Sequence, residues 1–153
     1  MTNDTPSLKG RALRLLSGRE YSRTELERKL AAFEEIPGSL ALALDELQAK
    51  DFISEQRVLE SVLHRHSARF GALRIKQELQ AKGLDAQQIR QAVAGLNDTE
   101  NDRARAIWRK KFGTIATDNK TRAQQARFLA TRGFSGDTIR FILSQPDQDP
   151  SFD

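Results

Sequence analysis

The chain has 153 residues and a formal net charge of +4; 38% of its residues are hydrophobic, 7% aromatic and 30% charged. It contains no cysteine, which excludes disulfides, thiolate nucleophiles and cysteine-based metal sites. Residues 1–7 are polar and lack the apolar core of a signal peptide, and no apolar run approaches the ~20 residues of a membrane span. The sequence therefore predicts a soluble, cytoplasmic protein.

The composition favours helices over sheet. Prolines and aromatic residues are few, whereas alanine, leucine, glutamine, arginine and glutamate are plentiful. Low hydrophobicity combined with many charges is typical of a thin core with much exposed helical surface. We therefore expect an all-α fold built from small modules.

The first predicted helix covers residues 8–17, where apolar residues recur at helical spacing. Tyr21-Ser22 follows it, and Ser22 with Glu25 matches a capping box that opens the next helix. Pro37-Gly38-Ser39 breaks the chain before a third helix. Residues 7–50 thus form a first predicted module of three helices.

Two further modules begin with similar amphipathic segments. Residues 55–69 carry apolar positions at helical spacing from Val58 to Leu63, and a later segment does so from Ala104 to Phe112. The segment 113–118 lengthens the loop that follows in the third module. The prediction is nine helices in three modules (7–50, 51–97 and 98–145), with disordered ends at 1–6 and at the acidic 146–153.

One pattern recurs with an offset of 50 residues. Its two clear copies are Leu79, Gly83, Leu84, Asp85, Ile89, Val93 and Leu129, Gly133, Phe134, Ser135, Ile139, Leu143. The leucine suits the buried face of a helix, the glycine a left-handed C′ position, and Asp85 or Ser135 the N-cap of the next helix. A degenerate copy, Leu30, Leu40 and Leu44, lies 49 residues before the first.

Positive charge increases along the chain. Residues 1–50 carry 8 basic and 8 acidic side chains, residues 51–97 carry 7 and 5, and residues 98–144 carry 10 and 5. Such a gradient attracts phosphates or an acidic protein surface. The alternative is a solvated helical surface that only aids solubility, and net charge alone does not separate the two.

Residue patterns of catalysis are missing from the sequence. His64 and His66 are two residues apart, so on a helix they point about 200° apart and cannot share a metal. There is no phosphate-binding Gly-x4-Gly-Lys-Ser/Thr loop and no paired acid and base in an apolar setting. We expect a protein that is not an enzyme and needs no cofactor or metal.

Three segments resemble the RecX family. Residues 18–30, GREYSRTELERKL, are similar to its R-x-x-S-x-x-E-L-x-x-K-L opening. Residues 70–83 resemble its central G-x-x-R-I-x-x-E-L-x-x-K-G-I segment, and residues 126–135 its R-F-L-x-x-R-G-F segment. Ser54-Glu55 and Val58-Leu59 depart from the family's acidic and aromatic-Ala pairs, although the apolar character is kept.

The resemblance implies three tandem three-helix repeats in an elongated, curved array. It also implies a monomeric regulator that binds in the groove of RecA–DNA filaments. Such a regulator inhibits RecA ATP hydrolysis, strand exchange and co-protease activity, and so modulates DNA repair by homologous recombination and the SOS response. No membrane partner is expected.

Basic residues of the second and third modules are the predicted partner-binding residues. They are Arg65, Arg69, Arg74, Lys76, Lys82, Arg90, Arg105, Arg109, Lys110, Lys111, Lys120, Arg122, Arg127, Arg132 and Arg140. Each taken singly is also compatible with a solvent-facing helix position. Two other functions stay open at this point: direct, non-specific binding of single- or double-stranded nucleic acid, and a scaffold unrelated to RecA.

Overall fold

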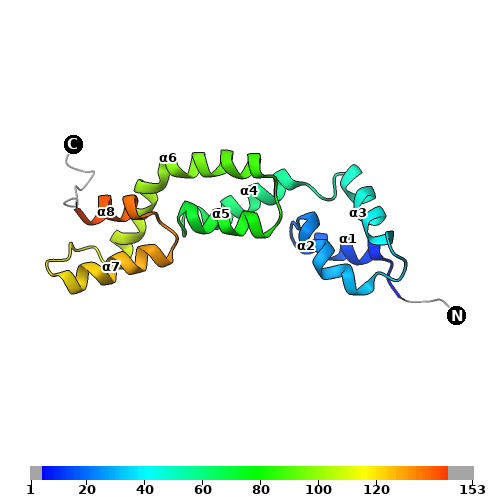
Figure 1. The fold of residues 1–153 in the computed structure, drawn as a ribbon, viewed down its shortest axis with the longest axis horizontal. Coiled ribbons are helices and arrows are strands. Elements are labelled where there is room, and N and C mark those ends of the chain that lie inside the picture. Colours follow the sequence, from blue (N-terminus) through cyan, green and yellow to red (C-terminus); the bar gives the residue numbers. More distant parts are fainter. Residues whose placement is uncertain (1–4, 145–153) are drawn as a thin grey trace. The chain divides into compact units, whose positions relative to one another are not determined.

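The computed structural model describes residues 5–144. The ends predicted to be disordered, 1–6 and 146–153, lie outside the described residues apart from Thr5 and Pro6. Between residues 5 and 144 the regular structure is helical, which confirms the expected all-α class (Figure 1). In that range no helix combines the length and apolar character needed to cross a bilayer.

The described residues form α1 (Leu8–Gly18), α2 (Arg23–Leu30), α3 (Ser39–Ala49), α4 (Glu55–His66), α5 (Ala72–Ala81), α6 (Ala86–Lys111), α7 (Asn119–Thr131) and α8 (Gly136–Ser144). A 3-10 turn, Ala31–Phe33, follows α2. By contact the chain divides into two compact units, Met1–Ser61 with Leu79–Asp85, and Val62–Glu78 with Ala86–Asp153.

The predicted break between two helices at residues 97 and 98 is wrong. Helix α6 continues through this point, so the described residues hold eight α-helices instead of nine. Leu96, Glu100, Ala104 and Trp108 are all buried at four-residue intervals, so one buried face runs through the expected boundary. The polar run 97–102 contains no proline that would stop the helix. The division into three modules at 50/51 and 97/98 itself stays a prediction.

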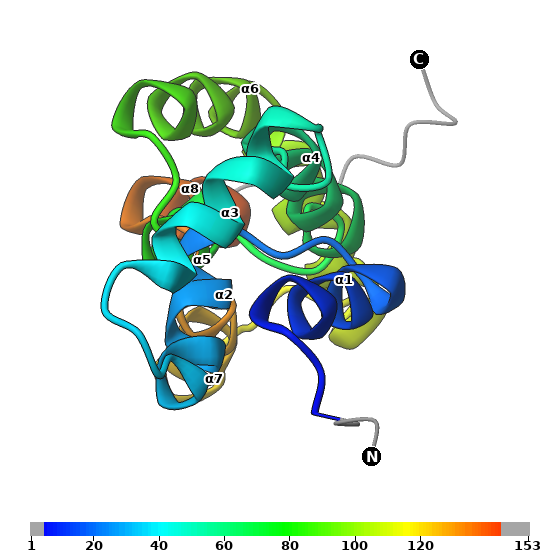
Figure 2. The ribbon, with the colours of Figure 1, turned by 90° about the vertical axis from the view of Figure 1, so that its right-hand side faces the viewer.

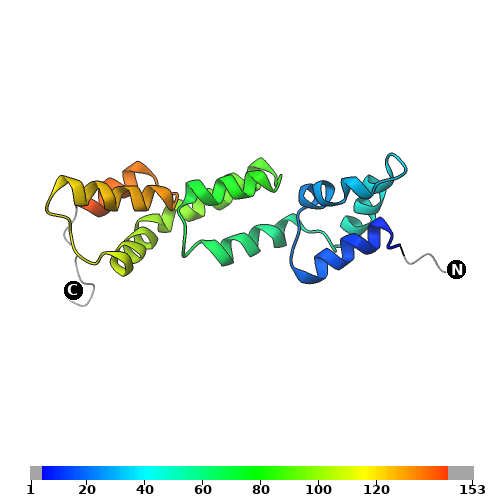
Figure 3. The ribbon, with the colours of Figure 1, turned by 90° about the horizontal axis from the view of Figure 1, so that it is seen from below.

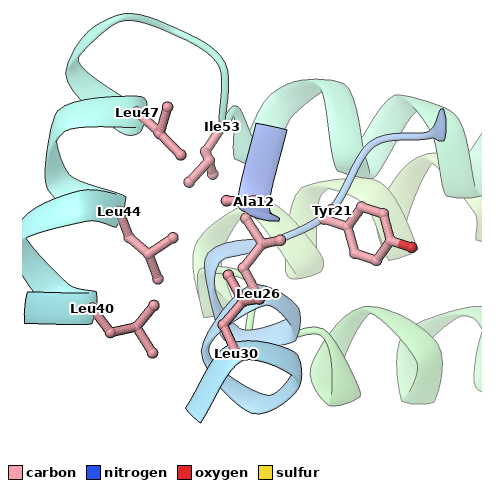
Figure 4. Packing of buried hydrophobic residues seen from close by; sticks show 8 residues of the cluster. All are labelled: Ala12, Tyr21, Leu26, Leu30, Leu40, Leu44, Leu47 and Ile53. Carbon is pink, nitrogen blue, oxygen red and sulfur yellow. The ribbon is translucent and has the colours of Figure 1, made fainter. Parts of the chain in front are cut away.

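In the first unit α1, α2 and α3 pack around one apolar core (Figures 2 and 4). The side chains of Leu26 and Leu30 on α2 point toward those on α3, and Ala12 of α1 is fully buried among them. The predicted capping box is present: Glu25 N donates to Ser22 Oγ at 3.1 Å, and Ser22 N donates to Glu25 Oε1 at 3.0 Å. The α3 contribution consists of Leu40, Leu44 and Leu47.

In the second unit, the C-terminal part of α6 packs against α7 and α8 (Figure 3). Its core contains Trp108 of α6 and Leu129 of α7. Trp108 Nε1 donates to Gln125 Oε1 at 2.9 Å, and Gln125 Nε2 donates to Thr114 O at 3.1 Å. The long loop predicted between α6 and α7 is thus present and tied to the core.

The repeated turn motif takes the predicted conformation at both copies. Gly83 and Gly133 have φ values of 72° and 89°, as expected for left-handed C′ residues. The following N–H in each copy donates back to the buried leucine carbonyl, over 3.4 Å in the first copy and 3.2 Å in the second. Leu79, Leu84, Leu129 and Phe134 are all buried. These local features of the repeat are therefore confirmed.

Candidate partner-binding site

The turn that leads from α4 to α5 is held in place by Arg103 of α6. Its Nη1 donates to Ser67 O and to Phe70 O, both at 2.7 Å, and its Nη2 donates to Leu96 O at 2.9 Å. Burial lowers the pKa of Arg103, an effect that the nearby carboxylate of Glu100 opposes. The bonds to Ser67 O and Phe70 O satisfy carbonyls that the end of α4 and the turn after it leave unpaired, and they fix the position of Phe70.

A second turn, at the end of α7, lies directly against the first. Gly71 N donates to Arg132 O at 2.8 Å, and Leu73 N donates to Gly133 O at 3.2 Å. These two bonds join backbone segments that are about sixty residues apart in sequence. They bring the side chains of Phe70 and Arg132 onto one surface.

On this surface, cations lie over aromatic rings. The Phe70 ring centroid is 3.8 Å from Arg74 Cζ and 5.7 Å from Arg132 Cζ. The Phe128 ring centroid is 5.1 Å from Arg132 Cζ and 5.7 Å from Lys111 Nζ. These distances are typical of cation–π attraction, which orients a guanidinium. Arg132 Nη1 also donates to Arg69 O at 3.5 Å, and its other N–H groups can bind an anion. We call Phe70, Arg74, Lys111, Phe128 and Arg132 the cation–aromatic cluster.

A pocket of about 540 Å³ opens beside the cluster. Four of its lining residues are cations (Arg69, Lys110, Lys111 and Arg132), and none is acidic. The remaining lining residues are Ala68, Phe70, Ile107 and Phe128. A concave, partly apolar site with a positive rim can accept an apolar side chain together with carboxylate or phosphate groups.

Glu100 is a buried residue that connects the helices carrying this surface. Its side chain is buried, at 5% exposure, and accepts hydrogen bonds from Ala72 N at 2.9 Å and from Thr138 Oγ1 at 2.8 Å. It also accepts from Ser135 Oγ at 3.3 Å. One carboxylate therefore joins the starts of α5 and α8 to the middle of α6. Sequence reasoning missed both Glu100 and Arg103, although Glu100 is four residues from both Leu96 and Ala104 and so lies in phase with the buried stripe.

Comparison with known proteins identifies the family. The profile of the RecX third three-helix domain matches residues 98–143, and that of the second matches residues 54–93. A regulatory protein RecX from Leptothrix cholodnii is 48% identical over 147 residues, which cover 96% of this chain and 94% of that protein. The chain belongs to the RecX family. Another RecX, from Herminiimonas arsenicoxydans, is 44% identical over 142 residues, covering 93% and 94% of the two chains.

Solved RecX structures share the fold. RecX from Lactobacillus salivarius superposes with a TM-score of 0.74 at 21% identity, covering 90% of this chain and 92% of that one. A second structure, of a regulatory protein RecX, gives a TM-score of 0.71 at 19% identity, covering 90% and 72%. The architecture seen here is therefore that of other RecX proteins.

The structure of this RecX-family chain gathers some of the predicted binding residues and separates others. Arg69, Arg74, Lys110, Lys111 and Arg132 meet at the cation–aromatic cluster and its pocket. Two further pockets of the second unit each include predicted cations: Arg122 and Arg140 line one of about 470 Å³, and Lys76 lines one of about 420 Å³. Arg105 Cζ lies 5.4 Å from the centroid of the Phe141 ring.

The other predicted residues lie elsewhere. Arg65, Arg90, Lys120 and Arg127 are exposed on α4, α6 and α7, and Arg109 is half-buried on α6. Lys82 is different, because its Nζ forms an ion pair with Glu25 Oε2 at 3.2 Å and its side chain is only 13% exposed. This pair stabilises the first unit, so much of the charge of Lys82 is already neutralised.

Proposed function

We propose that this RecX-family protein binds RecA filaments assembled on DNA and restrains their activity. The pocket beside the cation–aromatic cluster serves as the main contact. The observation that supports this assignment is the convergence of Arg69, Lys110, Lys111 and Arg132 around one partly apolar pocket, in a chain that belongs to a family of regulatory proteins. A protein bound in the filament groove inhibits ATP hydrolysis, strand exchange and co-protease activity by occupancy alone.

The geometry of the cluster suits a contact with a protein partner. Arg132 lies near both Phe70 and Phe128, so little side-chain entropy remains to be lost when its guanidinium meets a carboxylate. Arg69 and Lys110 are exposed at the rim, where they steer an acidic surface toward the pocket. In this proposal the protein acts as a cytoplasmic monomer, without cofactor or catalysis.

Direct binding of nucleic acid is the second candidate. The observation that favours it is a short row of exposed cations on one face of α7, Lys120 and Arg127, seven residues apart within the most basic third of the sequence. Such a row can follow a phosphate backbone without reading its sequence. A protein acting in this way would inhibit RecA by removing its DNA.

The two candidates are separated by RecA ATP hydrolysis measured on excess single-stranded DNA. We expect inhibition to persist in excess DNA, and to weaken about tenfold in the double variant Arg69→Glu with Lys110→Glu. The matched variant Lys120→Glu with Arg127→Glu makes the same charge change on α7 and should retain most of the inhibition. Loss of inhibition as DNA is added would support the second candidate, and equal loss in both variants would show that only net charge matters. Circular dichroism checks that both variants keep their helical content.

A further inference from the structure

Residues 1–50 carry no net charge, but the structure separates their charges by position. Of the seven acidic side chains within residues 5–50, five are in ion pairs. Glu20 pairs with Arg57 at 2.9 Å and Glu25 with Arg19 at 2.8 Å, whereas Arg23 pairs with both Glu27 and Asp45. Although the net charge of residues 1–50 is zero, they therefore form a surface where several cations have no paired carboxylate.

That surface is a pocket of about 280 Å³ lined by Arg11, Arg14, Leu15, Lys29, Leu30 and Phe33. Among the described residues, none of its three cations has a carboxylate within ion-pair distance. Its walls are two leucines and a phenylalanine, and it has room for one large apolar side chain. We call it the Arg11–Phe33 pocket.

Large apolar side chains are also exposed in this pocket and in the pocket beside it. Phe33 is 47% exposed and Ile36 is 70% exposed. Ile36 lines a neighbouring pocket of about 420 Å³, which shares Arg11 and Phe33 with the first and also contains Glu35. Adjacent exposed apolar residues beside uncompensated cations are typical of a binding surface.

We propose that the Arg11–Phe33 pocket binds an acidic peptide segment that carries a large apolar side chain. The apolar side chain enters between Leu15, Leu30 and Phe33. Carboxylates on either side of it meet Arg11, Arg14 and Lys29. The proposal concerns the first unit alone and is independent of RecA binding by the second.

The position of Arg11 favours a peptide over a nucleic acid. Single-stranded nucleic acids bind exposed aromatic rings by stacking their bases on the ring face. Here Arg11 Cζ lies 3.9 Å from the centroid of the Phe33 ring, so the guanidinium already covers one face. In the same position it presents N–H donors in a fixed orientation, which suits a carboxylate.

The test is fluorescence anisotropy with the full-length protein and no RecA or DNA. The probe is a fluorescein-labelled peptide of sequence Glu-Asp-Glu-Phe-Asp-Glu-Asp. We expect saturable binding that weakens about tenfold or more in Arg14→Glu with Lys29→Glu, and also weakens in Phe33→Ala. Both cations of the double variant are exposed, so the helical content should be unchanged.

Three comparisons identify what the pocket recognises. The control variant Lys120→Glu with Arg127→Glu has the same charge change in the second unit and should bind the peptide normally. Equal weakening in this control, or equal binding of a peptide with alanine in place of phenylalanine, would overturn the proposal. So would displacement of the probe by an oligothymidylate of equal charge as readily as by the unlabelled peptide. Because RecA is absent, none of these results depends on the function proposed above.

Discussion

The backbone of Gly71 lies directly against the backbone of Gly133. A methyl group on Gly71 would lie 2.3 Å from Gly133 O, and Gly71 N donates to Arg132 O at 2.8 Å. The cation–aromatic cluster depends on this approach, because it places Phe70 beside Arg132. Glycine at position 71 is therefore required by packing between two turns.

We expect Gly71→Ala to destabilise the second unit by about 1–3 kcal/mol, because backbone atoms on both sides must move to admit the methyl group. Chemical denaturation monitored by circular dichroism measures this change. The control is Gly95→Ala on α6, where no atom lies within 4 Å of the added methyl group. There, alanine should be neutral or stabilise the helix by up to about 1 kcal/mol. Equal stability of the two variants would contradict the close approach at Gly71.

Glu100→Ala should destabilise the protein by about 1–3 kcal/mol or more. The substitution leaves Ala72 N and Thr138 Oγ1 without their acceptor in the interior of the second unit. The change is read from urea denaturation, with exposed Asp98→Ala on the same helix as the control. A loss below about 0.5 kcal/mol, as is usual for surface sites, would show that water replaces the carboxylate.

The environment of Glu25 predicts that the free energy of unfolding decreases in acid. Burial would raise the pKa of its carboxyl group, but hydrogen bonds from Arg19, from Ser22 N–H and from Lys82 outweigh burial and lower the pKa to about 2, from an ordinary value of 4.5. A lowered pKa in the folded state stabilises the protein above the unfolded pKa. This contribution, at most about 3 kcal/mol, is lost as the pH falls from about 5 toward 2.

The variant Glu25→Gln tests this pH dependence. It should be less stable than the parent near neutral pH, and its stability should fall less steeply between about pH 5 and 2. Glutamine also suits this position of a capping box, so the helix start is preserved. The control Glu27→Gln removes a pair with Arg23 in which Glu27 is 49% exposed, and should cost about 0.5 kcal/mol or less. Parallel acid profiles for Glu25→Gln and the parent would contradict the assignment.

Asp51 offers a stabilising substitution. Its φ is 66°, and no other described non-glycine residue has a positive φ. Glycine adopts this conformation without steric cost, so Asp51→Gly should gain up to about 1 kcal/mol. Part of the gain is offset because the pair of Asp51 with Arg57, at 3.0 Å, is lost, although Asp51 is 80% exposed in this pair. In thermal unfolding, Asp51→Gly should have a higher Tm than Asp51→Ala. The alanine variant also loses the ion pair but keeps a β-carbon at a positive φ.

Local sequence signals predicted the repeated elements well. The burial of Leu79 and Leu129, the positive φ of Gly83 and Gly133, and the Ser22–Glu25 capping box follow from interactions within one or two helical turns. Such short-range interactions depend on the spacing of residues along the chain, so they can be recognised without knowledge of the tertiary structure. The family resemblance, confirmed by its relatives, rests on the same spacing.

The tertiary structure alone decided how these elements combine. The polar run 97–102 continues α6 with Glu100 facing the interior. There its carboxylate accepts hydrogen bonds from Ala72 N and Thr138 Oγ1, which lie 28 and 38 residues away in sequence. Likewise, Lys82 looked like one more surface cation, but packing places it against Glu25. The sequence by itself determined the repeated turns, the Ser22–Glu25 cap and the buried leucine positions, because these are local. Which cations stay available for a partner was decided only when distant segments came together, since ion pairs and cation–π contacts depend on position in space.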